Sequence, residues 1–161
     1  MEVSNIWVTS DTHFGHENII KYSDRPFKDI DEMDEIMIQR WNKVVQPGDK
    51  IYHLGDVYMG SGERFLKKFA RLNGKKRLVV GNHDDLKRKI DGKIYLGDLF
   101  QKIYLFRAFK DFGLMFTHVP IHEGSITGAG EGAINVHGHI HTRPSPKGPY
   151  KCVCVEQTNY T

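Results

Sequence analysis

One stretch of the chain reads Leu78-Val79-Val80-Gly81-Asn82-His83-Asp84, an apolar run that passes through a glycine into three polar residues. The apolar run predicts a buried strand, and the glycine indicates a sharp turn at its end. Ligand sites in open α/β sheets form beyond the carboxyl ends of the strands. The stretch therefore predicts that its three polar side chains lie at such a site.

Four other short apolar runs end in the same way. They lead into Asp11-Thr12-His13, Gly55-Asp56, His118 and Gly138-His139-Ile140-His141. Five such strand ends can converge on one crevice, where they supply carboxylate, imidazole and amide groups, which suit Mn, Fe, Zn and Ni. Seven candidate ligands are too many for one tetrahedral ion and fit two ions that share a carboxylate. They are Asp11, His13, Asp56, Asn82, His118, His139 and His141.

The motifs follow the order Asp-x-His, Gly-Asp, Gly-Asn-His-Asp, His and Gly-His-x-His, and they span residues 11–141. This order resembles that of the calcineurin-like metallophosphoesterases. Protein Ser/Thr phosphatases of that group extend the second motif to Gly-Asp-x-x-Asp-Arg-Gly, whereas this chain continues after Asp56 as Val57-Tyr58-Met59-Gly60. The resemblance is therefore closer to small bacterial and phage-type phosphoesterases. It implies an α/β fold, a sandwich of two mixed β-sheets flanked by helices.

The resemblance also implies a role for each motif residue. One metal would be held by Asp11, His13, Asp56 and His141, and the other by Asp56, Asn82, His118 and His139. His118 follows threonine where the family carries glycine, so its assignment rests on the loosest motif. Two ions roughly 3.5–4 Å apart can clamp phosphoryl oxygens and turn a bridging water into hydroxide. The expected cofactors are two divalent ions, Mn first, with Fe, Zn, Ni or Mg as alternatives.

The catalytic assignments rest on the third motif and on the residues beside the first. His83 would face the substrate and, when protonated, give a proton to the leaving oxygen, and Asp84 would orient or charge it. His16 and Asn18 are expected either to contact substrate or to cap the following helix, with substrate contact favoured for His16. His53 lies inside a predicted strand, where a core or metal-supporting role is expected.

Hydrophobic periodicity and turn residues predict the secondary structure. Strands are expected over residues 5–10, 50–55, 77–80, 102–106, 113–117, 134–137 and 150–155, and helices over 17–22, 29–45, 61–72 and 84–90. Helices alternate with strands early and strands follow one another late, which indicates a parallel half and an antiparallel half. The glycine-rich residues 124–132 predict a mobile surface loop. No linker divides the chain, so residues 1–161 are expected to form a single domain.

The composition is that of an ordinary globular protein, with 161 residues, 39% hydrophobic, 27% charged and a formal net charge of +3. That charge is too small to indicate nucleic acid by itself. No apolar run approaches the roughly 20 residues of a membrane span, and the N-terminus lacks a signal-peptide pattern. Cys152 and Cys154 are predicted to be free thiols. These features predict a cytoplasmic protein without a membrane partner, and the resemblance adds a homodimer as one option.

Three functions compete. The leading hypothesis is a metal-dependent hydrolase of a phosphomonoester or phosphodiester, either a small molecule or a nucleotide. A nuclease acting on DNA or RNA ranks second, because the sequence shows neither an added DNA-binding domain nor an aromatic platform for single strands. A non-catalytic protein-binding scaffold ranks third. The chain keeps His83 and all seven candidate ligands, which argues against a scaffold.

Overall fold

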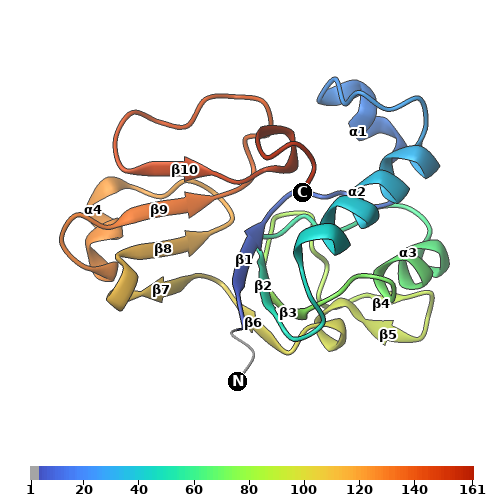
Figure 1. Cartoon of the computed structure of the whole chain (residues 1–161), viewed down its shortest axis with the longest axis horizontal. Coiled ribbons are helices and arrows are strands. Elements are labelled where there is room, and N and C mark those ends of the chain that lie inside the picture. The colour runs from blue at the N-terminus through green and yellow to red at the C-terminus, as the bar shows by residue number, and fades with distance from the viewer. Residues whose placement is uncertain (1–3) are drawn as a thin grey trace.

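The computed structural model describes residues 4–161 and contains two four-stranded sheets that lie side by side (Figure 1). The first sheet has the order β1-β2-β3-β6 and is parallel throughout, and the second has the order β10-β9-β8-β7. The strands of the first sheet are β1 (Ile6–Thr9), β2 (Lys50–His53), β3 (Lys75–Val79) and β6 (Lys102–Tyr104). Those of the second are β7 (Arg107–Phe109), β8 (Leu114–Thr117), β9 (Ile134–His137) and β10 (Tyr150–Cys152). The predicted α/β sandwich of two sheets is thereby confirmed.

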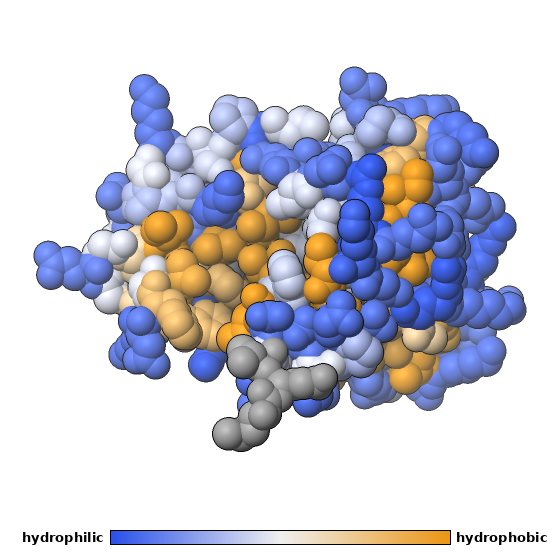
Figure 2. Space-filling model, in the orientation of Figure 1, coloured by the Kyte–Doolittle hydropathy of each residue, from blue (hydrophilic) through white to orange (hydrophobic). Residues whose placement is uncertain are grey.

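Helices cover the side of the first sheet that faces away from the second (Figure 1). They are α1 (Glu17–Tyr22), α2 (Ile30–Val44) and α3 (Gly62–Phe69). α2 begins where the Asp29 carboxylate accepts the N–H of Glu32, and it buries Met33, Met37 and Trp41 at helical spacing. Figure 2 shows hydrophilic side chains predominating over this helical half and apolar side chains gathering over the second sheet.

The inner faces of the two sheets form a second core. Tyr52 and Val79 from the first sheet pack with Phe116 and Val136 from the second. Close packing of these side chains holds the strands of the two sheets in place. The core therefore fixes where the strands end, and the polar motifs begin at those ends. Among residues 4–161, no helix combines the length and the apolar character that crossing a membrane requires.

The predicted antiparallel half is wrong in part. Both β10–β9 and β8–β9 are parallel, and β7–β8 is the antiparallel pair of this sheet. The expected strand over 102–106 is in fact two strands, because β6 ends at Tyr104 in the first sheet and β7 begins at Arg107 in the second. The chain thus crosses between the sheets at Leu105 and Phe106, and β7 rather than β6 forms the hairpin with β8.

Two local predictions are also corrected. Residues 84–88 do not form a helix; they are irregular, with a bend over 86–88, and lead into β4 (Lys89–Ile90), which pairs with β5 (Ile94–Tyr95). The Asp85 carboxylate accepts the N–H groups of Lys87 and Arg88, and such local bonds compete with the helical pattern. The glycine-rich segment 124–132 contains α4 (Glu123–Ile126) and a 3-10 turn, and it buries Ile126 against the second sheet.

Candidate metal centre

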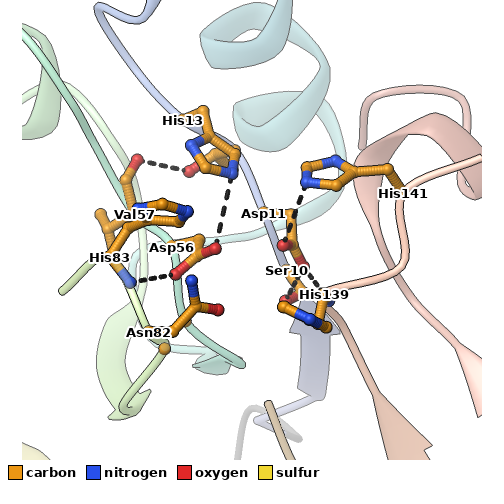
Figure 3. Close-up of polar contacts among 12 residues, drawn as sticks. Ser10, Asp11, His13, Asp56, Val57, Asn82, His83, His139 and His141 are labelled. Atoms are coloured by element: carbon orange, nitrogen blue, oxygen red, sulfur yellow. Dashed lines mark hydrogen bonds and ion pairs between the residues drawn. The ribbon is translucent and has the colours of Figure 1, made fainter. Parts of the chain in front are cut away.

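The carboxyl ends of five strands meet at one place. The residues after β1, β2 and β3 face those after β8 and β9, so the motifs that are far apart in the sequence come together (Figure 3). Figure 3 shows His13 and His141 at one end of the pair of carboxylates, and Asn82 and His139 at the other. Convergence at the strand ends is what the sequence predicted.

The side chains form two groups that can each hold a cation. The first group is Asp11, His13 and His141, and the second is Asp56, His118 and His139; within each group one ligand atom per residue lies within 4.8 Å of the others. Asp56 links the two, because its Oδ2 lies 3.4 Å from His118 Nε2 and 3.6 Å from His13 Nε2. Asn82 adjoins the second group, since its Oδ1 lies 2.8 Å from His118 Nε2.

The backbone at these turns is conformationally costly. Five of the seven predicted ligands have left-handed φ angles, namely Asp11 (59°), His13 (49°), Asp56 (56°), His139 (72°) and His141 (51°). Residues other than glycine enter this region rarely, and each costs of order 1–3 kcal/mol when the surroundings enforce it. Such strain gathers at functional sites because it aims several side chains at one point.

Three buried atoms of the first group have no hydrogen-bond partner among the described residues. They are Asp11 Oδ1 and both ring nitrogens of His13. The other Asp11 oxygen, Oδ2, accepts the N–H of His139 at 2.8 Å, so only one side of that carboxylate is satisfied. An orphaned buried polar atom costs roughly 1–3 kcal/mol. A cation in the first group would satisfy Asp11 Oδ1 and one ring nitrogen of His13, an oxygen and a nitrogen donor of the kind that divalent metals prefer.

The electrostatics of the second group also favour a cation. Burial alone would lower the pKa of His118, but its hydrogen bond with Asp56 and the charges of Asp11 and Asp56 outweigh burial and raise it to about 9. Burial alone would raise the pKa of Asp56. The hydrogen bonds that Asp56 accepts from His118 and from the backbone N–H of His83 outweigh burial and lower this pKa. The Asp56 carboxylate therefore attracts positive charge, which a divalent ion supplies more strongly than a proton.

The predicted catalytic residues occupy different positions. His83 is exposed, and its ring lies 5.7 Å from the His13 ring in a cleft of about 550 Å³ that Asp56, His139 and Arg143 also line; we call it the histidine cleft. The Asp84 carboxylate accepts the backbone N–H groups of Asp56 at 2.9 Å, Val57 at 3.0 Å and Gly81 at 2.8 Å. Both of its oxygens serve backbone donors, so we interpret Asp84 as positioning the Asp56 turn rather than orienting His83.

The two residues predicted to contact substrate lie in different places, one in the histidine cleft and the other outside it. His16 lines the histidine cleft, with its ring centroid 5.5 Å from that of His13, and its side chain makes no capping hydrogen bond to α1. Asn18 is exposed in the first turn of α1 and is not part of the cleft lining. The geometry thus favours substrate contact for His16 over helix capping, and it gives Asn18 no comparable position.

Two glycines bring the carboxylates close to neighbouring backbone. A Cβ added at Gly81 would meet Asp56 Oδ1 and the Asp56 nitrogen, and one at Gly138 would meet Asp11 Oδ2 and the Ser10 hydroxyl. Neither glycine has a positive φ, in contrast to Gly55 at +97°. Glycine is therefore required for two different reasons. At Gly81 and Gly138 a side chain would collide with neighbouring atoms, and at Gly55 the backbone adopts a left-handed conformation.

Arg25 and Glu156 are supporting residues that the sequence analysis missed. The buried Arg25 guanidinium donates to the carbonyl oxygens of Asp11 at 2.7 Å and Thr12 at 2.8 Å, and to Glu156 Oε1 at 2.7 Å. The same Glu156 oxygen lies 2.9 Å from His141 Nδ1. A carboxylate that accepts Nδ1–H fixes the imidazole and directs Nε2 to a metal. No metal-ligand spacing marks Arg25 or Glu156, so the sequence carried no signal for them.

Replacing Glu156 with glutamine is expected to weaken the first group. The amide keeps the shape but loses the negative charge that orients His141 and pairs with Arg25, and loss of such a partner lowers metal affinity by about 10–100-fold. Calorimetric titration of the chelator-stripped protein with Mn²⁺ measures the effect. Glu63→Gln, at an exposed carboxylate on α3, is the matched control and should bind as the original chain does. Equal affinity in both variants would contradict the supporting role.

His53 makes stability depend on pH. Burial lowers the pKa of His53 to about 3. In the neutral ring, Nε2 lies 2.9 Å from Thr12 Oγ1, and Nδ1 accepts the N–H of Gly55 at 3.2 Å. A proton on Nδ1 would face that N–H. Above the pKa of His53 in the unfolded chain, near 6.5, the contribution of the neutral ring to the free energy of unfolding is fully present. This contribution is lost as pH falls from 6.5 toward 3, because the unfolded chain then binds a proton that the folded chain does not.

The change in the free energy of unfolding that the pKa shift of His53 causes is expected to be roughly 1.4 kcal/mol for each pKa unit. Urea unfolding at pH 7 and pH 4.5, in chelator, measures the free energy of unfolding of the original chain and of His53→Gln. The glutamine variant should lose less stability between the two pH values, since its amide does not titrate. An equal loss in both proteins would show that His53 is not the group responsible.

At the carboxyl ends of its two sheets, this α/β sandwich brings together two groups of Asp and His residues that could each hold a metal ion. The sequence profile of the calcineurin-like phosphoesterases matches residues 4–158. The chain belongs to the calcineurin-like phosphoesterase family, as its motifs predicted. Membership implies divalent metal ions and phosphate-ester substrates.

The relatives cover different parts of the chain. An uncharacterized protein of Methanocaldococcus jannaschii is 33% identical over 99% of this chain and 86% of its own length. The Gene 66 protein of Mycobacterium phage L5 is 34% identical over 51% of this chain and 41% of its own length. The solved structure of a protein of unknown function from Aquifex aeolicus matches with a TM-score of 0.70 at 27% identity, covering 98% of this chain and 94% of that one. The phage relative agrees with the predicted phage-type resemblance.

Proposed function

We propose that this protein hydrolyses a phosphomonoester or phosphodiester with two divalent cations, Mn first among the candidates. Asp11, His13, Asp56 and His141 would hold one ion, and Asp56, Asn82, His118 and His139 the other. The observation that carries the proposal is the pair of Asp and His groups joined through Asp56, with buried donor atoms of the first group unpartnered among the described residues. Bound cations supply Lewis-acid charge for the phosphoryl oxygens and lower the pKa of water.

The side chains that line the histidine cleft would donate the proton to the leaving group and bind the phosphate. The backbone N–H of His83 donates to Asp56 Oδ1 at 2.9 Å, which holds the His83 backbone beside the shared carboxylate. His83 is exposed to the histidine cleft, where a protonated imidazole can donate to the departing ester oxygen and leave it as a neutral alcohol. Arg143 and His16 line the same cleft and supply donors for the phosphate.

The test needs metal and substrate to be varied separately. Protein stripped with chelator is reloaded with Mn²⁺ or Ni²⁺, bound metal is quantified, and a chromogenic phosphodiester, a phosphomonoester and a single-stranded oligonucleotide are offered. We expect turnover of one of the two small esters that disappears with chelator and returns with metal. Cleavage of the oligonucleotide alone would favour the nuclease. No turnover of any substrate by protein with confirmed metal would contradict the enzyme and favour the scaffold.

A further inference from the structure

An apolar hollow of about 530 Å³ lies on the other side of the second group from the histidine cleft. Leu105, Phe106, Met115, Val119 and Ile121 contribute apolar side chains to it. We call it the Phe106 hollow, after the aromatic ring at the crossing between the sheets. Its volume falls within the roughly 300–1,000 Å³ of pockets that hold small ligands.

The second cation group sits on the boundary between the two hollows. Asn82 and His118 line the Phe106 hollow, whereas Asp56 and His139 line the histidine cleft. Residues on the two sides are neighbours, because His118 Nε2 lies 3.4 Å from Asp56 Oδ2 and the ring centroids of His118 and His139 are 5.1 Å apart. A phosphate held at this boundary therefore has room for a substituent on either side.

The two sides differ in chemistry. No Lys, Arg, Asp or Glu is among the residues that line the Phe106 hollow, while the histidine cleft contains Arg143 and several imidazoles. Leu105 is 80% exposed and Phe106 61% exposed, a large apolar surface to leave in water beside a candidate site. His118 belongs to the second cation group, so the hollow has no Lys or Arg free to bind a second phosphate, and an exposed phenyl ring suits stacking against a flat uncharged group.

We propose that the Phe106 hollow binds an uncharged aromatic substituent of the phosphate ester while the phosphate lies at the cation groups. This inference rests on the proposed function and narrows its substrate class to aryl or nucleoside esters. Phe106 then acts as a specificity residue, since it contacts the substituent and not the phosphorus. The preference for an aromatic over a methyl substituent should be about tenfold, which lies at the low end of what stacking of one aromatic ring contributes.

Two phosphonates that differ only in the substituent test this inference without any turnover. Phenylphosphonate and methylphosphonate are titrated calorimetrically into the Mn²⁺-loaded full chain. We expect phenylphosphonate to bind about tenfold more tightly, and Phe106→Ala to remove the difference while leaving methylphosphonate binding unchanged. Phe112→Ala, at a 69% exposed phenylalanine outside the hollow, is the matched control and should keep the preference.

Each other outcome overturns the inference. Equal binding of the two phosphonates, with ester hydrolysis intact, leaves the proposed function standing and rejects the hollow as a substituent site. Binding of neither phosphonate also rejects it, and the hydrolysis assay then decides the proposed function separately. Sedimentation of Phe106→Ala and the original chain completes the test, because a change in oligomeric state would assign the exposed apolar surface to contact with a second copy instead.

Discussion

The Asp56→Asn variant is expected to lose metal-dependent hydrolysis by roughly 1000-fold or more, an effect of about 4 kcal/mol on the barrier. Asp56 is the residue between the two groups, with one oxygen 3.4 Å from His118 Nε2 and 3.6 Å from His13 Nε2. Its other oxygen accepts the N–H of His83 at 2.9 Å. An amide keeps the size of the side chain but removes the negative charge that two neighbouring cations would share.

Metal analysis separates this effect from simple damage to the fold. The original chain is expected to retain two Mn²⁺ ions after desalting, and Asp56→Asn one or none, by elemental analysis of the same samples. Asp111→Asn, which changes an exposed aspartate outside both groups, is the matched control and should keep both the metal and the activity. A variant that keeps two ions and full turnover would remove Asp56 from the shared position.

The sequence was most informative where local pattern and chemistry coincide. Short apolar runs that end in Asp, His or Asn predicted the strand ends, and the parallel alignment of β1, β2 and β3 explains why those ends meet. The long helix was equally readable, because Asp29 caps it and its apolar side chains repeat at helical spacing. Neither conclusion required knowledge of which segments are neighbours in space.

The features that could not be predicted from the sequence depend on contacts between segments that are distant along the chain. Arg25 and Glu156 are 131 positions apart, and their ion pair exists only because the chain returns to β1 after β10. The crossing at Leu105 and Phe106 interrupts an apolar run that by itself reads as one strand, and only pairing of β7 with β8 divides it. The left-handed turns at the candidate ligands could not be placed from local propensity, because Asp and His adopt them more often than most residues but still in only a small share of cases.

Replacing His83 with alanine is expected to lower kcat by about 10²–10⁴-fold while both metal ions stay bound, because a positioned general acid contributes on that scale. The ring is exposed in the histidine cleft and belongs to neither cation group, so its loss removes a proton donor and no ligand atom. His122→Ala, at an exposed histidine outside the cleft, is the matched control and should keep both the metal and kcat.

The leaving group gives this prediction its sharpest form. A p-nitrophenolate departs without protonation, whereas an alkoxide needs a proton, so His83→Ala should lose much less activity on a p-nitrophenyl ester than on an alkyl ester. Measuring kcat for both esters with both proteins gives four rates, and the acid role requires that the ratio of losses clearly exceed one. Equal losses on the two esters, with two metal ions retained, would instead assign His83 to binding the phosphate, and full activity on the alkyl ester would exclude it from catalysis.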